Sequence, residues 1–487
     1  MKTTFLREVT LYRYRYTIGY IVFGILLFAL LLLGVDQIPR GLTQAEMDSA
    51  VTSVNVNVFH PIATNVVDAP YHILQKASIH LLGLTPVAIK LPSIILGALT
   101  GVGIILMLQR WFRKNVALVT ALIIVTSVGF LSLSRLGTPM IMTAFWTVLL
   151  LLGATRVLHS EKHRFAWKLF CFISIALLAY SPFGVYPLLV MVLAGIIHPH
   201  VRHRLKQGKW WQHLIAIILT LLTLSPLIVA IIHTPSIGLQ LLGIEHIQEF
   251  KLQDILSNIL SNANNLFNFV QPTVGPLVTP IFGIATTVLL LLGIMKLFTA
   301  TYSARSYMLL IWTIALAVIL TVRPDMLLLV IVPSALVLAI GIETLIRQWY
   351  DLFPRNPYAR IAALIPLSIL LVSIIGINME RYFYGLLYSP VTASFHEELP
   401  AVRKTISDEK LRDTKAVVVV LSEQVRFYDL LRREYPKLVI DTQARDANTP
   451  KIIFSDTGIV PGVQSPKRIV TSDLKQADQS VLLRVYR

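Results

Sequence analysis

The sequence predicts a polytopic α-helical membrane protein that carries a small C-terminal α/β domain. Of its 487 residues, 55% are hydrophobic and only 14% are charged, which is too apolar for a soluble protein of this length. Runs of about 17–23 apolar residues, enough to cross roughly 30 Å of hydrocarbon as a helix, recur as far as Asn378. After Asn378 the composition becomes that of a water-soluble module.

The apolar runs define eleven predicted spans, at 17–34, 91–109, 116–133, 139–157, 166–181, 183–198, 213–232, 277–297, 307–322, 326–346 and 361–378. Two long segments, 35–90 and 233–276, separate them. Inside these segments, Pro70–Leu84 and Ile244–Phe269 repeat apolar residues at helical spacing among polar ones. That pattern predicts two helices that lie in the membrane interface.

The net charge of +17 could suggest a nucleic-acid partner, but the basic residues gather before the first span and in alternate short loops. This distribution follows the positive-inside rule. It predicts a multi-pass protein of the plasma membrane with a cytoplasmic N-terminus. The first apolar run is long for a signal peptide and lacks a small-residue cleavage site, so a retained signal anchor is expected. With an odd number of spans, the two long segments and the C-terminal domain face outward.

The predicted domain organisation is a transmembrane domain at 1–378 and an outward soluble α/β domain at 379–487. In the second part, the pattern predicts helices and strands in alternation: helices at Glu397–Asp413 and Ser422–Glu434, and strands at Ala416–Leu421, Leu438–Asp441, Ile452–Phe454, Arg468–Val470 and Val481–Val485. The single cysteine, Cys171, lies inside a span, so no intrachain disulfide forms and a cysteine metal site is not expected.

Carboxylates close to the bilayer suggest chemistry on a membrane substrate. The first long segment holds three candidates: Glu46, Asp48 and Asp68. Each also has a simpler interpretation as a solvated or helix-capping carboxylate. The residues specify no metal site and no cofactor, and whether a divalent metal takes part stays open.

Short motifs in the first 200 residues carry a resemblance to a known superfamily. They occur in the order Ile38-Pro-Arg-Gly-Leu-Thr-Gln-Ala-Glu46, Ala69-Pro-Tyr-His72, Leu81-Leu-Gly83, Lys90-Leu-Pro-Ser93 and Ser134-Arg-Leu-Gly-Thr-Pro139, with a weaker echo at Arg323-Pro-Asp325. In order and spacing, the series resembles the GT-C superfamily of membrane glycosyltransferases. The similar members are protein-mannosyltransferase-like or aminoarabinose-transferase-like (glycosyltransferase family 39-like).

The resemblance implies a GT-C-like helical fold and a transferase that moves a sugar from a polyprenyl-phosphate donor to a lipid, glycan or protein acceptor at the outer face. Inverting transfer needs a carboxylate base for an acceptor hydroxyl and cations for the departing phosphate. Glu46, Asp48 and Asp68 are the candidates for the base, and Glu46 is favoured because it matches an acidic family position. The candidates for substrate binding are Arg135, Arg323, Lys76, Lys90, His72 and Tyr71.

The chain departs from the family pattern at the position usually given to the base. Ala45-Glu46 stands where the family has Asp-Glu, and Thr138 and Met140 replace the arginine and aspartate of Arg-Pro-Asp. Another carboxylate therefore serves as base, or the acceptor is already an anion, or the chain does not catalyse. The alternatives to a transferase are a non-catalytic lipid-glycan-binding or scaffold relative and, less favoured, a lipid-linked sugar transporter. A transporter should show charged residues and broken helices in the middle of its spans.

Overall fold

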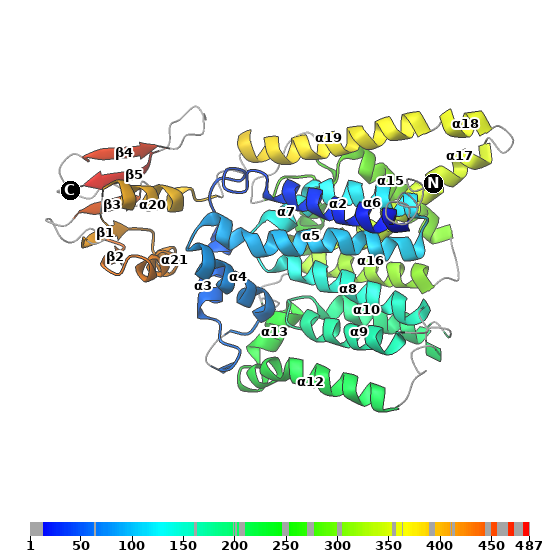
Figure 1. The fold of residues 1–487 in the computed structure, drawn as a ribbon, viewed down its shortest axis with the longest axis horizontal. Helices are drawn as coiled ribbons and strands as arrows, with labels where there is room; N and C mark the ends of the chain where they lie inside the picture. Colours follow the sequence, from blue (N-terminus) through cyan, green and yellow to red (C-terminus); the bar gives the residue numbers. More distant parts are fainter. Residues whose placement is uncertain are drawn as a thin grey trace, which may run out of the picture.

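The computed structural model has a helical bundle with a small sheet domain at one end (Figure 1). It describes residues 13–62, 65–159, 163–197, 199, 202–203, 210–245, 253–269, 277–299, 304–352, 357–362, 364–388, 395–409, 411, 414–443, 450–454, 466–471 and 481–486.

Each of the eleven segments predicted to span the membrane contains an apolar helix. These helices are α2 (Arg13–Leu32), α5 (Pro86–Trp111), α6 (Lys114–Thr126) with α7 (Val128–Arg135), α8 (Met140–His159), α9 (Arg164–Leu178), α10 (Val185–Ile197), α12 (Trp210–His233), α15 (Ile284–Thr299), α16 (Ala304–Val322), η2 (Pro324–Val330) with α17 (Ile331–Leu352), and α19 (Leu364–Tyr388). Five described helices are long and apolar enough to cross a membrane, and α6 with α7 makes a sixth candidate. The chain is a multi-pass membrane protein.

The segment predicted as one straight span at 116–133 is instead broken. Helices α6 and α7 meet at Ser127 with a bend of 63°. The Ser127 hydroxyl accepts a hydrogen bond from the Phe130 amide at 3.3 Å, and the Gly129 amide donates to the Ile281 carbonyl at 3.2 Å. The break therefore has a capped start for α7 and an outside partner for a freed amide, which sequence hydropathy does not reveal.

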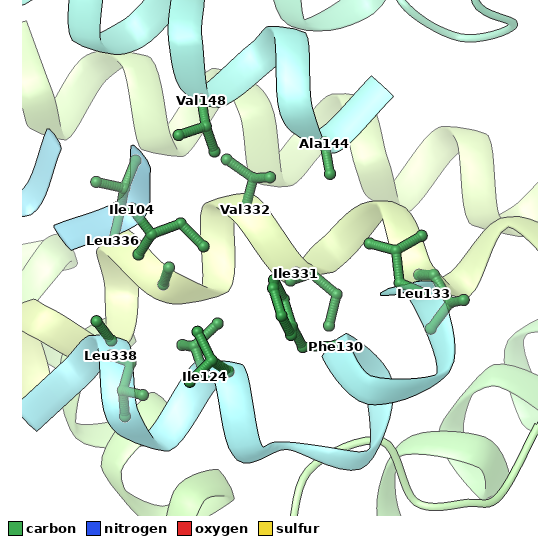
Figure 2. Packing of buried hydrophobic residues seen from close by; sticks show 14 of the residues in the cluster. Ile104, Ile124, Phe130, Leu133, Ala144, Val148, Ile331, Val332, Leu336 and Leu338 are labelled. Atoms are coloured by element: carbon green, nitrogen blue, oxygen red, sulfur yellow. The ribbon is translucent and has the colours of Figure 1, made fainter. Parts of the chain in front are cut away.

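The first part of helix α17, residues 331–342, lies inside the bundle. Its side chains Ile331, Val332 and Leu336 are buried and form one apolar core with residues of α5, α6, α7 and α8 (Figure 2). A helical segment that is apolar on all sides is stable only when neighbours surround it, which accounts for the burial of residues 331–342.

Short helices cover the end of the bundle that faces the sheet domain (Figure 1). They are α3 (Gln44–Asn55), α4 (Ala69–Leu82) and α13 (Ser236–Leu242). Helix α14 (Asp254–Phe267) packs against α16 and η2, and α18 (Pro357–Ala362) precedes α19. Helix α4 corresponds to the interfacial helix predicted at Pro70–Leu84, and α14 to the second half of the one predicted at Ile244–Phe269. Residues 246–252 of that prediction lie outside the described residues.

The C-terminal domain is a five-stranded sheet in the order β2-β1-β3-β5-β4, in which β1, β2 and β3 are parallel and β5 is antiparallel to β3 and β4. Its elements are α20 (Glu398–Asp408), β1 (Ala416–Val419), α21 (Val425–Tyr428), η5 (Asp429–Arg433), β2 (Leu438–Asp441), β3 (Lys451–Phe454), β4 (Arg468–Thr471) and β5 (Val481–Tyr486). All five strands lie where the sequence pattern predicts them.

The sheet domain is docked onto the membrane part through a shared core. Leu42, Met47 and Leu84 of the first long segment are buried in one apolar cluster with the domain's Leu399 and Val418. Backbone hydrogen bonds in both directions also join Leu42 to His396, at 3.0 and 2.8 Å.

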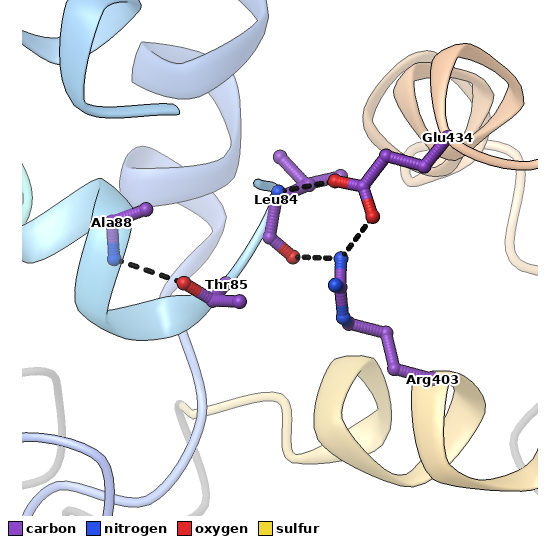
Figure 3. Close-up of polar contacts among 5 residues, drawn as sticks. All are labelled: Leu84, Thr85, Ala88, Arg403 and Glu434. Carbon is purple, nitrogen blue, oxygen red and sulfur yellow. Dashed lines mark hydrogen bonds and ion pairs between the residues drawn. The ribbon is translucent and has the colours of Figure 1, made fainter. Parts of the chain in front are cut away.

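Two local features explain how closely the two parts approach. A Cβ on Gly41, whose φ is +86°, would collide with the His396 carbonyl oxygen, so only glycine fits there. Beside it, the Glu434 carboxylate accepts from the Leu84 amide at 2.6 Å and pairs with Arg403 at 2.7 Å, and Arg403 donates to the Leu84 carbonyl at 3.0 Å (Figure 3). Together these contacts fix the domain against the start of α5.

Replacing Arg403 by alanine should weaken this docking without unfolding either part. Partly exposed ion pairs contribute about 0.2–1 kcal/mol, and the Leu84 carbonyl loses a donor. We expect faster proteolysis at the junction, measured by limited digestion of the purified protein. The variant Arg432→Ala, which breaks an exposed pair with Asp429 on the domain itself, is the control. Equal digestion of both variants would contradict the docking role.

Candidate active site

The structure sorts the residues singled out by sequence into separate groups at the end of the bundle that carries α3 and α4. Glu46, Lys90 and Arg135 surround the segment 38–41 and Gly137. Asp68 and Arg323 instead border the segment 180–183, which follows α9. The helix α4 lies between, with Tyr71, His72 and Lys76 on it.

Glu46 is fully buried, and both of its carboxylate oxygens are engaged. Its Oε2 accepts from the amide and the hydroxyl of Thr43, at 2.8 and 3.1 Å, in a capping box at the start of α3. Its Oε1 accepts from the Gly137 amide at 2.7 Å. These contacts describe a carboxylate that starts a helix and ties it to the segment between α7 and α8.

Lys90 and Arg135 are also buried, and both donate to backbone carbonyls. The Lys90 ammonium donates to Gly41 at 2.8 Å and to Pro39 at 3.2 Å. The Arg135 guanidinium donates to Ile38 at 2.5 Å and lies over the rings of Tyr382 and Phe383. Both cations hold the segment after α2 in place, and Arg135 Nε has no hydrogen-bond partner among the described residues.

The polar residues of α4 join it to α3 and α5. Ser49 and Ser53 both donate to Gln75 Oε1, at 2.9 and 2.5 Å, and Ser53 Oγ lies 2.7 Å from His72 Nδ1. Because the single Ser53 proton goes to Gln75, we assign the ring proton to His72 Nδ1 and the lone pair to Nε2. Burial lowers the pKa of His72 to about 4, so the imidazole is neutral at pH 7.

Two further candidates on α4 have structural partners. The Tyr71 hydroxyl lies 2.7 Å from Ser93 Oγ, which itself donates to the Thr138 carbonyl at 3.2 Å. Lys76 donates to the Val56 carbonyl at 2.9 Å and so closes the end of α3. The hydrogen bonds of these two side chains therefore go to α5 and to the end of α3.

Asp68 differs from Glu46 because one of its carboxylate oxygens is unused. It is 5% exposed, and its Oδ1 has no hydrogen-bond partner within the described part of the chain. Its amide donates to the Tyr180 carbonyl at 2.8 Å. Burial raises the pKa of Asp68 to about 7, although the nearby Ser181 hydroxyl offsets part of the shift. The side chain is therefore a carboxyl that gains and loses a proton near neutral pH.

Arg323 approaches the same segment from α16. Its guanidinium carbon lies 5.9 Å from the centre of the Phe183 ring, and its Nε and Nη2 pair with both oxygens of Asp325 at 3.0 and 2.9 Å. Arg135 contacts α2 and α19 instead. The contacts thus bring Asp68 and Arg323 to the two sides of one segment but do not bring Arg135 and Arg323 together.

The backbone is strained at both ends of this arrangement. Among the described residues, Asp68 (φ 52°) and Phe183 (φ 61°) are the two non-glycine residues with positive φ. A left-handed conformation is costly for an aromatic residue, and such strain persists where the surroundings enforce it, often at functional sites. The Phe183 amide donates to the Leu241 carbonyl at 2.9 Å, which anchors the segment to α13.

An apolar groove begins close to Arg323. It is lined by α14, α15, α16 and α17, with Asn262 at 8% exposure and an Oδ1 atom that has no partner among the described residues. Asn258 and Asn262 donate to the carbonyls of Thr321 and Leu320, in the last turn of α16 just before Arg323. An apolar chain could therefore lie in the groove with a polar end near Arg323.

The remaining points are the position of Asp48 and whether the described residues could bind a metal ion. Asp48 is exposed on α3 and accepts from Gln44 Nε2 at 3.1 Å. Within the described ranges, no three His, Cys, Asp or Glu side chains gather to hold a metal ion.

Sequence reasoning missed Gln75, Ser181 and Phe183. The Thr43-Gln-Ala-Glu46 signature of a capping box was readable and would have pointed to the role of Glu46 in starting α3.

Comparisons with known proteins agree with this architecture. The sequence profile of the family described as dolichyl-phosphate-mannose-protein mannosyltransferase matches residues 70–229. A search of curated proteins finds no significant match.

Solved structures match over most of the chain. ArnT from Cupriavidus metallidurans bound to undecaprenyl phosphate is 14% identical, with a TM-score of 0.52 over 97% of this chain and 98% of that one. The oligosaccharyltransferase from Archaeoglobus fulgidus is 15% identical, with a TM-score of 0.55 over 88% of this chain; the match spans 65% of that longer protein. The resemblance read from the sequence motifs is confirmed, and the chain has the fold of the GT-C superfamily.

Proposed function

We propose that the chain transfers a sugar from a polyprenyl-phosphate donor to an acceptor, at the end of the bundle that carries α3, α4 and the sheet domain. The observation that carries the proposal is Asp68: a buried carboxyl with an unused oxygen, a pKa near 7 and a left-handed backbone. Structural side chains rarely combine these features, because each costs stability.

In the proposed reaction the acceptor hydroxyl attacks the anomeric carbon of the sugar as its proton passes to Asp68. The bond from that carbon to the phosphate oxygen breaks, and polyprenyl phosphate leaves with the electron pair. A general base is worth typically 10²–10⁴-fold in rate, and its pKa is best placed near the working pH. A pKa of about 7 meets that requirement better than an ordinary aspartate does.

Arg323 and the groove between α14 and α17 supply the donor side of the proposal. The isoprenoid tail lies in the apolar groove, and its phosphate reaches Arg323, whose Nη1 is not used by Asp325. An arginine stabilises a leaving phosphate through charge-assisted hydrogen bonds. The undecaprenyl phosphate bound to ArnT supports a polyprenyl carrier for this chain too.

The predicted topology becomes part of this proposal. Residues 1–378 form the transmembrane domain with a cytoplasmic N-terminus, and 379–487 the extracytoplasmic domain, in the plasma membrane. The site at α3 and α4 then faces outward. The supporting observation is the basic residues of the sequence, which gather in alternate loops.

A transfer assay tests the function. The purified full chain, in lipid nanodiscs, is incubated with radiolabelled polyprenyl-phosphate monosaccharides and candidate acceptors from the envelope. We expect label to move to one acceptor class with release of polyprenyl phosphate. No release from any donor, by protein that still binds polyprenyl phosphate, would overturn the transferase proposal.

Replacing Arg323 by alanine should raise the KM for the donor about tenfold, because one charge-assisted contact to the phosphate is lost. Arg323→Lys should recover only part of the affinity, since a lysine cannot reproduce the planar fork. Arg347→Ala, which breaks an exposed pair with Glu343 on α17, is the control. Unchanged donor KM in Arg323→Ala would remove this residue from the donor site.

A second candidate, a non-catalytic relative that binds lipid-linked glycans, is favoured by one observation. Ala45 stands at the family's acidic position, and the neighbouring Glu46 has both oxygens occupied by Thr43 and Gly137. This candidate predicts polyprenyl-phosphate binding without turnover, in wild type and Asp68→Asn alike.

A further inference from the structure

The junction between α3 and the sheet domain holds a second polar site, distinct from the one at Asp68. A surface groove there is lined by Val51 and Asn55 of α3 and by residues of α21 and η5, including Arg426, Asp429 and Arg433. Because both structural parts contribute to it, the groove exists only when the domain is docked.

The charge of this groove is strongly positive. Three arginines line it, Arg426, Arg432 and Arg433, against one lining carboxylate, Asp429. Asp429 pairs with Arg432 at 3.1 Å. Among the described residues, the guanidinium groups of Arg426 and Arg433 make no hydrogen bond or ion pair. Two arginine forks are therefore available to an anion.

The groove is also held in a fixed shape. Glu434, the residue after Arg433, accepts from the Leu84 amide and pairs with Arg403 (Figure 3). The opposite wall is α3, whose start is fixed by the capping box of Thr43 and Glu46. These contacts fix the backbone on both sides of the groove, so that the two exposed arginines start from fixed positions when an anion arrives.

We propose that this groove binds a phosphate group of the acceptor. Planar guanidinium forks match phosphate oxygens in bidentate geometry, and the groove lies beside the interfacial helices, where a headgroup or a phosphorylated glycan arrives. Asp48 lies on the same face of α3, one turn before Val51 and two turns before Asn55, and it gives an acceptor for sugar hydroxyls at the groove's edge. That the bound phosphate belongs to the acceptor rests on the proposed transferase function. The binding of phosphate in the groove does not depend on it.

Binding of inorganic pyrophosphate tests the proposal. The full chain in nanodiscs of phosphatidylcholine alone is titrated by calorimetry, as wild type, as Arg426→Gln/Arg433→Gln, and as Lys467→Gln/Arg468→Gln. The last pair removes the same charge from residues that pair with Glu409 and Asp408 at the other edge of the domain. We expect wild-type binding, a loss of about tenfold or more in the groove variant, and a change below about twofold in the control.

Equal losses in both variants, or no wild-type binding up to the order of 10 mM, would overturn the site. A competition arm identifies the source: a short-chain phosphatidic acid that displaces pyrophosphate far more strongly than glucose 1-phosphate does indicates a lipid headgroup, and the reverse indicates a phosphorylated glycan. In the transfer assay, the groove variant should raise the acceptor KM and leave the donor KM unchanged. Pyrophosphate binding without any sugar transfer would overturn the transferase proposal and would still support this phosphate site.

Discussion

Replacing Asp68 by asparagine should lower the rate of sugar transfer by about 10²–10⁴-fold. The substitution keeps the shape of the side chain and removes only its capacity to take a proton. Asparagine tolerates the left-handed conformation at φ 52° at least as well as aspartate does. A loss of activity would therefore reflect chemistry and not a changed backbone. Initial rates of label transfer measure it, with Asp408→Asn in the sheet domain as the control.

The same variant should be more stable than the wild type at high pH. The folded pKa of Asp68 is about 7 against an ordinary value of 3.8, so the folded state holds its proton more tightly than the unfolded state. Stability from this group is complete below pH 3.8 and is lost as the pH rises toward 7. At 1.36 kcal/mol per pKa unit, the ionised carboxyl costs up to roughly 4 kcal/mol above pH 7. The asparagine side chain of the variant does not ionise, so this cost is absent from it.

Thermal unfolding at pH 5 and pH 8 separates the two explanations for Asp68. If it is the base, transfer by the wild type rises with pH up to about 7 and then levels off, and Asp68→Asn gains stability mainly at pH 8. A variant that loses activity and stability together at both pH values would instead mark Asp68 as a structural residue.

Most of the fold was readable because it depends on local pattern. Long apolar runs located the apolar helices, and short apolar runs located strands such as Leu438–Asp441 to the residue. The break at Ser127 was not readable, because it depends on a carbonyl at Ile281, more than 150 residues away in the sequence. Docking of the domain likewise depends on Arg403 and Glu434 meeting Leu84.

The candidate site was less predictable, because long-range partners decide what each charge does. The sequence identified five candidates for catalysis or substrate binding, and the structure brings all of them to the same end of the bundle: Glu46, Asp68, Lys90, Arg135 and Arg323. The sequence could not show that the Gly137 amide donates a hydrogen bond to Glu46. It also could not show that Arg135 and Lys90 donate to the carbonyls of Ile38 and Gly41. Which carboxylate keeps an unused oxygen is a property of the packed fold, and the roles of these residues stay predictions.

Replacing Glu46 by glutamine should destabilise the protein by about 1–3 kcal/mol, the cost of leaving a buried hydrogen-bonding group unsatisfied. The carboxylate accepts three hydrogen bonds, two from Thr43 and one from Gly137. A glutamine amide offers one oxygen, so its NH₂ group must face either the Thr43 amide or the Gly137 amide, and both are donors. The start of α3 then loosens from the segment between α7 and α8.

Transfer by the folded fraction of Glu46→Gln should stay within about tenfold of the wild type, since Glu46 has no free oxygen to act as a base. Thermal unfolding and initial rates are measured together, with Glu343→Gln on α17 as the matched control. The opposite pattern, unchanged stability with transfer lost by about 10²–10⁴-fold, would make Glu46 the base, as the family resemblance suggests. It would also require the Gly137 contact to open during catalysis, because the 2.7 Å bond from that amide occupies the oxygen that faces the rest of the site.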